Sequence, residues 1–308
     1  MSHTSEQTIL RQEQFDTLRA IIYAHVGIHF PDAKKALLAS RLSRRVSELN
    51  LESYDQYVQY LTIAPDREQE LQEMLSRVTI NHTSFFRDPQ QLAYLRDTAL
   101  PQLIEARRRE RTLRVWSAAC STGEEPYTLA ILIHQALGER LPDWRIEVLG
   151  TDVSARALAA AEQARYPDDA IRAVDPVVRV RYFRQDGPFW TIDPLVRSLV
   201  SFDIHNLKDR LGAKRYGAWD AVVCRNALIY FDDAMRARVA AMFADQLKPG
   251  GWLAVGASES LQSLDVPLTA DGDGPARLYR PAFPPSAQTA AATGSTAPPA
   301  KPGRLRLA

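Results

Sequence analysis

The chain has 308 residues, enough for one large domain or two smaller ones, and its composition is ordinary for a globular protein. A formal net charge of +1 argues against bulk binding of nucleic acid, and no apolar run approaches the roughly 20 residues that span a bilayer. Because the start is polar and the two cysteines show no metal-like spacing, we expect a cytoplasmic protein without structural disulfides or a bound metal.

Residues 1–77 predict a small helical domain. Apolar residues recur at helical spacing from about residue 10, and a break follows at 27–32 (GIHFPD). The same spacing indicates further helices at about residues 33–49, 52–61 and 67–78. There is almost no strand signal in this part of the chain.

The second of these helices carries a basic face. Lys34, Arg41 and Arg45 are spaced so that they share one side of it. Such a face is usually only solvated, and the alternative is that it docks an acidic partner.

Residues 78–112 connect the helical domain to the rest. The segment 78–87 (VTINHTSFFR), called the lid segment below, breaks the helical period. It is either an interdomain loop anchored by Phe85 and Phe86, or a lid that turns polar and charged side chains toward a ligand. Spacing alone leaves the two interpretations equal. In the second one, the side chains facing the ligand are Asn81, Thr83 and Arg87.

The stretch 113–130 (LRVWSAACSTGEEPYTLA) predicts a strand, a tight loop of small residues and a helix. Proline suits the first helical position, so we expect the helix to begin at Pro126. Small side chains between strand and helix let a ligand approach the backbone closely. The acids Glu124 and Glu125 at the end of the loop suit a cationic ligand rather than a phosphate.

A second strand is predicted at 144–149, and Asp152 follows at its tip. In doubly wound nucleotide-binding folds, an acid at this position hydrogen-bonds ribose hydroxyls. The alternative is that Asp152 caps the following helix, although Ser154 can serve as the cap and leave the carboxylate for a ligand.

The remaining pattern alternates strands and helices. Short strands with turn signals predict a small β insertion at about 181–204, and His205, Asn206 and Leu207 come directly after it. An apolar strand at 219–224 leads into polar residues up to Tyr230. The alternation predicts an α/β fold, a doubly wound and mostly parallel sheet that binds ligands at its carboxyl edge. Residues 281–308 are expected to be a disordered tail.

Several segments follow one another in a recognisable order: NHTSFFR at 81–87, VWSAACSTGEEPY at 115–127, TD at 151–152, NL at 206–207, CRNALIYF at 224–231, LKPGG at 247–251 and GASESL at 256–261. Taken together, they resemble the chemotaxis-receptor glutamate O-methyltransferases (CheR type). The resemblance covers about residues 10–280. It implies that a Rossmann-like methyltransferase domain with the β insertion, at 113–280, follows the helical domain and the lid segment along the chain.

The resemblance also implies S-adenosyl-L-methionine as cofactor, S-adenosyl-L-homocysteine as product and glutamates of chemoreceptor cytoplasmic helices as substrate, hence a role in signal transduction. It carries these residues over as cofactor contacts: Asn81, Thr83, Arg87, Glu125, Asp152, Asn206, Leu207, Arg225 and Asn226. Arg87 and Tyr230 are expected to face the transferred methyl group and the incoming carboxylate. We expect receptor docking through Lys34, Arg41 and Arg45, location at receptor arrays, no insertion into the membrane and no binding of nucleic acid.

Two other functions compete with this one. A nucleic-acid methyltransferase would use the loop from Asn226 to Tyr230 and the basic helix, but the near-neutral charge disfavours it. A non-catalytic cofactor-binding scaffold is the other alternative.

Overall fold

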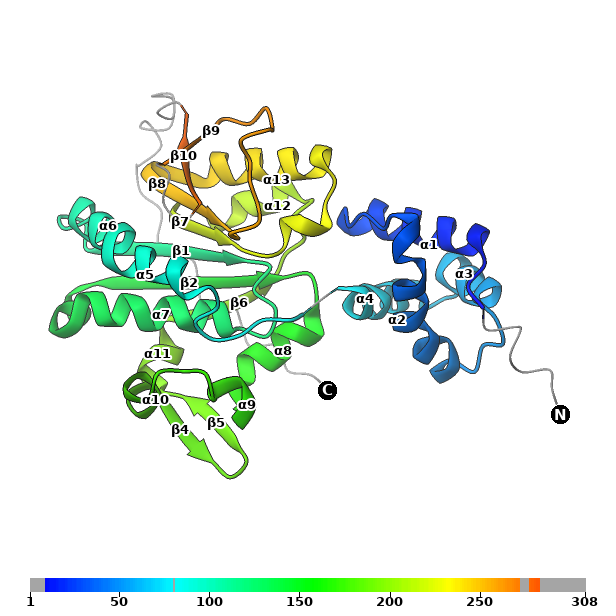
Figure 1. The fold of residues 1–308 in the computed structure, drawn as a ribbon, viewed down its shortest axis with the longest axis horizontal. Helices are drawn as coiled ribbons and strands as arrows, with labels where there is room; N and C mark the ends of the chain where they lie inside the picture. Colours follow the sequence, from blue (N-terminus) through cyan, green and yellow to red (C-terminus); the bar gives the residue numbers. More distant parts are fainter. Residues whose placement is uncertain (1–8, 80, 272–276, 283–308) are drawn as a thin grey trace.

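The computed structural model describes residues 9–79, 81–271 and 277–282. A helical domain lies beside a larger α/β domain, and the lid segment runs between them (Figure 1). The tail expected to be disordered lies, from residue 283 onward, outside the described residues. Within those residues, no helix is both long and apolar enough to cross a membrane.

Over residues 9–79, the helical domain packs four helices around one apolar core. They are α1 (Gln12–Val26), α2 (Lys35–Glu48), α3 (Tyr54–Ile63) and α4 (Arg67–Val78), with a 3₁₀ turn at Asp32–Lys34 before α2. The apolar stripe predicted for α2 is buried, as Leu38, Leu42 and Val46 show. Gly27 ends α1 in the left-handed region with φ 75°, a conformation that glycine adopts without strain.

One broken helix connects the lid segment to the sheet. It consists of α5 (Pro89–Tyr94), a π-helical turn (Leu95–Ala99) and α6 (Leu100–Ala106). Pro101 explains the break, because its ring removes a backbone N–H and clashes with the carbonyl four residues earlier.

In the part of the chain that the structure describes, the α/β domain is built on a seven-stranded sheet in the order β6-β2-β1-β7-β8-β10-β9. Its strands are β1 (Thr112–Ala118), β2 (Arg145–Asp152), β6 (Val200–Ile204), β7 (Trp219–Cys224), β8 (Leu247–Val255), β9 (Leu268–Ala270) and β10 (Leu278–Pro281). The first five in the sheet order are parallel, and β10 pairs antiparallel with both β8 and β9. The strand order reverses between β1 and β7, which is where such sheets bind ligands.

Helices cover both faces of this sheet (Figure 1). They include α7 (Glu124–Leu137), α8 (Ala155–Gln163), α12 (Arg210–Ala213) and α13 (Asp233–Gln246), with 3₁₀ turns at Gly138–Asp143, Lys214–Tyr216 and Leu228–Tyr230. Side chains of β1 alternate between two cores: Val115 packs with α6 and α7, and Trp116 packs with α13. The mostly parallel, doubly wound sheet predicted from the alternation is therefore confirmed.

The β insertion differs from its expected bounds. Its sheet has the order β3-β5-β4, from β3 (Arg165–Pro167), β4 (Phe183–Asp186) and β5 (Phe189–Ile192). Three short helices accompany it: α9 (Asp168–Ile171), α10 (Pro176–Tyr182) and α11 (Pro194–Ser198). The expectation of 181–204 was wrong at both ends, because the insertion starts at β3 and β6 pairs with β2 of the main sheet. An alternating strand pattern does not tell which sheet a strand joins.

Candidate active site

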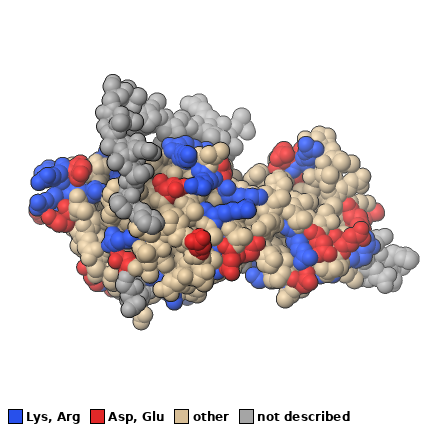
Figure 2. All heavy atoms as spheres, turned by 90° about the horizontal axis from the view of Figure 1, so that it is seen from above, with Lys and Arg blue, Asp and Glu red and all other residues tan. Residues whose placement is uncertain are grey.

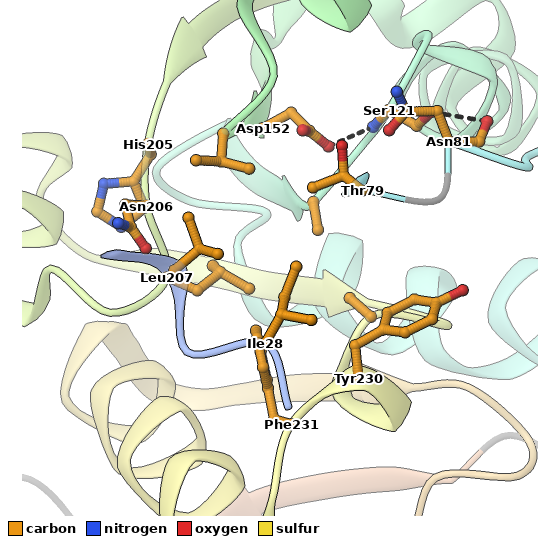
Figure 3. Close-up of a pocket in the computed structure, with 14 residues that line it drawn as sticks. Ile28, Thr79, Asn81, Ser121, Asp152, His205, Asn206, Leu207, Tyr230 and Phe231 are labelled. Atoms are coloured by element: carbon orange, nitrogen blue, oxygen red, sulfur yellow. Dashed lines mark hydrogen bonds between the residues drawn. The ribbon is translucent and has the colours of Figure 1, made fainter. Parts of the chain in front are cut away.

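The loop between β1 and α7 adopts a conformation that side chains usually avoid. Ala119 and Ser121 have φ of 59° and 53°, and Gly123 follows with φ 93°. Non-glycine residues pay about 1 kcal/mol or more for such angles, so they persist only where neighbours hold them. Ser121 is held on both sides: its backbone N–H donates to Asp152 Oδ2 at 2.8 Å, and its hydroxyl donates to the Asn81 carbonyl at 3.0 Å (Figure 3).

Helix α7 begins at Glu124, two residues before the expected start at Pro126. Glu124 and Glu125 therefore lie in the first turn, where the helix dipole favours negative charge. The two acids point differently. Glu124 accepts a hydrogen bond from the Thr122 hydroxyl at 2.7 Å, whereas Glu125 lines a cavity.

A first cavity lies between the helical domain and the carboxyl ends of the parallel strands. Asp152, Ser121 and Asn81 lie on one side of it, and Tyr230 lies on the opposite side (Figure 3). Most of its wall is apolar and comes from Val26, Ile28, Ala119, Val153, Leu207, Ala227 and Phe231. Asn206 also lines it. It is therefore an apolar cavity with a few polar groups, as ligand sites usually are.

A second, more polar cavity adjoins the first, and the two share Ala119 and Ser121 in their walls. The predicted residues that line it are Thr83, Arg87, Glu125, Arg225 and Asn226. Every residue expected to contact the cofactor thus lines one of two adjoining cavities at the switch point of the sheet.

The lid segment combines both of its interpretations. Phe85 is buried and packs edge-on against Tyr166 and Phe183, with ring centroids 4.8 and 5.1 Å apart. Its polar and charged neighbours Thr83 and Arg87 line the second cavity. The aromatic residue anchors the segment, and the polar residues face the cavity.

Asp152 is buried, with its carboxylate at the wall of the first cavity. Besides Ser121, the Ser154 backbone N–H donates to it, reaching Oδ1 at 2.9 Å. Ser154 itself caps α8 by accepting the N–H of Ala157. Burial raises the pKa of Asp152 above its ordinary value, although these backbone hydrogen bonds lower it in part. The carboxylate still has acceptor capacity left for a ligand.

Arg225 is a buried link between β7, the lid segment and α7. Its guanidinium donates to Gln91 Oε1 at 2.7 Å, to the Arg87 carbonyl at 2.6 Å and to Asp88 Oδ2 at 2.9 Å. It also pairs with Glu125 Oε2 at 3.3 Å. Arg225 therefore lines the second cavity, but its N–H donors already form hydrogen bonds to other residues of the protein.

Glu125 remains the acid that this cavity presents to a ligand. Ser117 Oγ donates to Oε1 at 2.8 Å, so both carboxylate oxygens have partners within the protein. Burial raises the pKa of Glu125, and the nearby Arg225 acts against that shift.

Tyr230 ends the 3₁₀ turn after β7 and is held by the helical domain. Its carbonyl accepts the N–H of His29 at 2.8 Å, and Ile28 forms an antiparallel bridge with Phe231. Burial raises the pKa of the Tyr230 phenol. A third cavity, sharing Ile28 and Tyr230 with the first, is lined in addition by His29, Phe30, Lys34, Leu37, Arg41 and Val78.

The structure separates the three basic residues expected to share one helix face: Lys34 lies in the 3₁₀ turn before α2, and Arg41 and Arg45 lie in α2. Lys34 and Arg41 line the third cavity. Arg45 does not line it, because its guanidinium forms hydrogen bonds to the buried carboxylate of Glu70, at 2.5 Å from Nη2. The three residues therefore do not line one cavity together, and a shared role in docking stays a prediction.

Residues of the helical domain also reach the first cavity. Val26, Ile28 and Thr79 line it, and the sequence patterns did not identify them. They are ordinary helix-end residues that the packing of the two domains brings to the site. Over the described ranges, no group of His, Cys, Asp and Glu side chains is arranged to hold a metal ion.

Comparison with known proteins agrees with this geometry. The family model for the all-alpha domain of CheR methyltransferases matches residues 13–79, and the model for their SAM binding domain matches residues 81–270. The chain is 36% identical to chemotaxis protein methyltransferase 2 of Pseudomonas aeruginosa, over 81% of this chain and 87% of that protein.

Two further relatives show the same extent of similarity. Chemotaxis protein methyltransferase 1 of Pseudomonas aeruginosa is 34% identical over 81% of this chain and 91% of its own. The chemotaxis protein methyltransferase of Escherichia coli is 33% identical over 87% of this chain and 91% of its own. The chain therefore belongs to the CheR family of S-adenosylmethionine-dependent methyltransferases.

Proposed function

We propose that this enzyme methylates glutamate side chains on the cytoplasmic helices of chemoreceptors, forming glutamyl methyl esters in sensory adaptation. The observation that carries the proposal is the gathering of all the expected cofactor contacts, and of Tyr230, around two adjoining cavities. The relatives' name, chemotaxis protein methyltransferase, supports the choice of receptor as substrate. We also propose that the enzyme works in the cytoplasm, at receptor arrays.

The two cavities suit the two halves of the cofactor. The apolar first cavity, with Leu207 and Asn206 in its wall, fits an adenine ring. Asp152, next to the shared residues Ala119 and Ser121, suits ribose hydroxyls. The polar second cavity, with Glu125 and Thr83, fits the amino acid part. When bound, S-adenosylmethionine supplies an electrophilic methyl group.

A substrate glutamate needs no general base. Its unperturbed pKa is about 4.3, so its carboxylate is already ionised at neutral pH. The chain has to orient this nucleophile and give its charge a partner after water is excluded. Arg87, in the wall of the second cavity, can hold a carboxylate through two parallel N–H bonds. The Tyr230 hydroxyl donates to the same carboxylate and fixes its direction.

We infer that the substrate helix docks on the surface around the third cavity. It joins the first cavity at Tyr230, and Lys34 and Arg41 supply positive charge at its wall. Two apolar side chains nearby are exposed: Leu37 on α2, with 38% of its surface accessible, and Ile229 next to Tyr230, with 49%. An acidic amphipathic helix matches this combination of charge and apolar surface. We therefore assign docking to Lys34 and Arg41, and a structural role to Arg45.

The alternatives have less support. Acidic and basic side chains are intermingled on the face seen in Figure 2, whereas binding of nucleic acid calls for a surface of one sign. A non-catalytic scaffold would not need Tyr230 in the wall of the first cavity and Arg87 in the wall of the second.

The test is transfer of labelled methyl from S-adenosylmethionine to a purified receptor cytoplasmic domain. We expect label on the receptor that is released as methanol by mild base, the behaviour of an ester. A receptor with its candidate glutamates replaced by alanine is the control and should take up no label. Base-stable label, label on added nucleic acid, or cofactor binding without any transfer would contradict the proposal.

A further inference from the structure

Glu259 is a buried acid behind the loop that carries Asn226 and Tyr230. It follows β8, it is 1% exposed, and it is not among the described residues that line the three cavities. A buried carboxylate costs several kcal/mol unless it is well hydrogen-bonded, so its partners show what it does.

The carboxylate of Glu259 accepts three backbone N–H groups. Oε2 accepts from Gly256 at 2.6 Å and from Asn226 at 2.9 Å, and Oε1 accepts from Ile229 at 3.1 Å. Two of these donors belong to the loop after β7, one near its start and one directly before Tyr230. Hydrogen bonds from N–H groups to a charged acceptor are the stronger kind, so this side chain holds the loop at two points.

The loop needs such support because its backbone is unusual. Asn226 has φ 60°, in the left-handed region. Gly256 lets the carboxylate come close, since a Cβ there would lie 2.6 Å from Glu259 Oε2 and 3.0 Å from the Asn226 nitrogen. The glycine, the acid and the strained loop therefore fit together as one unit.

We propose that Glu259 is a positioning residue for methyl transfer: it fixes the turn from Asn226 to Tyr230 and thereby the direction of the Tyr230 hydroxyl. The inference rests on the role given to Tyr230 under the proposed function. Glu259 itself does not touch substrate or cofactor, and it acts through the backbone of the loop.

The chemistry of the side chain makes the inference specific. Glutamine has one acceptor oxygen, and its amide nitrogen only donates. In Glu259→Gln, an amide oxygen at the Oε2 position still accepts the N–H groups of Gly256 and Asn226. The amide nitrogen then takes the place of Oε1, and because it only donates, the N–H of Ile229 loses its acceptor. Glu259→Asp keeps a carboxylate, but the side chain is one methylene shorter and the carboxylate lies farther from the loop. Both changes release the Tyr230 end of the loop.

The experiment is a double-mutant cycle of Glu259→Gln with Tyr230→Phe, measured as kcat and KM for receptor methylation. Tyr230→Phe alone should lower kcat. Glu259→Gln should lower kcat roughly 10- to 100-fold, the cost of a misplaced catalytic group. The same change should cost far less in the Tyr230→Phe background, because the hydroxyl it positions is already gone. If Glu259→Gln does not fold, the same double-mutant cycle is measured with Glu259→Asp.

Asp220→Asn is the matched control. Asp220 is also a fully buried acid with several partners, Arg107 at 2.6 Å, Lys248 at 2.9 Å and the Arg114 N–H at 2.8 Å, but it lies at the amino end of β7. It should lower stability and leave kcat unchanged. Hydrogen exchange should show loss of protection at the Ile229 amide in Glu259→Gln only, while the Asn226 amide stays protected.

The outcomes separate the two proposals. A full rate in Tyr230→Phe overturns the role of Tyr230, and with it the catalytic part of this inference. If Tyr230→Phe lowers the rate and Glu259→Gln lowers it by the same factor in both backgrounds, the two effects are independent. That result overturns the role of Glu259 alone. An unchanged kcat in Glu259→Gln does the same.

Discussion

The side-chain amide of Asn206 donates a hydrogen bond of 2.6 Å to the backbone carbonyl of His25. His25 lies in the last turn of α1, and the ammonium group of Lys208 donates to the neighbouring carbonyl of Ala24. The loop after β6 thus caps the carboxyl end of a helix in the other domain. Because Asn206 also lines the first cavity, one residue joins the cofactor site to the contact between domains.

The first prediction concerns this shared residue. Asn206→Ala should lower the free energy of unfolding by about 1 kcal/mol, the usual value of one hydrogen bond, and should also weaken S-adenosylhomocysteine binding several-fold. Thermal unfolding and calorimetry measure the two effects. Lys208→Met is the control, because Lys208 caps the same helix end and is not among the described residues that line the three cavities. Equal loss of ligand affinity in both variants would assign the effect to domain contact alone.

The second prediction follows from the buried acids of the site. Burial raises the pKa of Asp152, Glu124 and Glu125, so the folded chain holds protons to a higher pH than the unfolded chain. Their contribution to stability therefore falls as the pH rises from the ordinary to the raised pKa values. A ligand that needs Asp152 and Glu125 ionised must release protons on binding, and its affinity should fall as the pH is lowered through the same range.

Calorimetry in buffers of different ionisation enthalpy counts the protons released. S-adenosylhomocysteine binding at mildly acidic pH should release protons, and Asp152→Asn should release fewer and bind more weakly. Asn keeps the shape of the side chain, but its amide nitrogen cannot accept the N–H of Ser121 or Ser154. Binding that is independent of pH in this range would contradict the assignment of Asp152 to the cofactor.

The third prediction tests Arg87. Its Nη1 donates to the His82 carbonyl at 2.9 Å, which leaves other donors for a ligand. Arg87→Lys keeps the charge and loses the two-pronged geometry, so methyl transfer should slow roughly 10- to 100-fold, the value of one charged hydrogen bond of about 1.5–3 kcal/mol. Single-turnover kinetics measure it. Arg96→Lys, at an exposed arginine paired with Asp97, should leave the rate unchanged. An unchanged rate in Arg87→Lys would remove the carboxylate clamp.

The fourth prediction distinguishes two arginines of α2. Arg41→Gln should raise the KM for receptor about fivefold, in a salt-dependent way, without changing cofactor affinity, because the contact it loses is worth about 1 kcal/mol. Arg45→Gln should instead destabilise the helical domain by about 3 kcal/mol, since it leaves Glu70 buried without its cation. Steady-state kinetics and denaturant unfolding separate the two.

The control for this pair is Arg44→Gln, whose side chain is 84% exposed and pairs only with Glu48 among the contacts of the described residues. It should change neither quantity appreciably. A rise in KM for Arg44→Gln equal to that for Arg41→Gln would mean that the basic helix attracts the receptor by general charge rather than through the third cavity.

The sequence by itself determined the order of the elements and the chemistry of the strand ends. Period and turn residues respond to local forces, so the helices of the first domain and the loops holding Asp152 and Glu125 were predictable. The order of the similar segments also predicted the family. The start of α7 was displaced by two residues because the left-handed Gly123 and the helix dipole place the acids inside the first turn.

Only the tertiary structure decided which side chains share a cavity and which are already occupied. Arg41 and Arg45 look alike on a helix, yet the second pairs with Glu70, which lies on another helix. The alternating pattern of β6 could not tell the insertion from the edge of the main sheet. Val26 and Ile28 reach the site, and Glu259 supports it, through contacts with residues far away in the chain. Such contacts depend on packing between elements, which periodicity and turn residues within one segment do not predict.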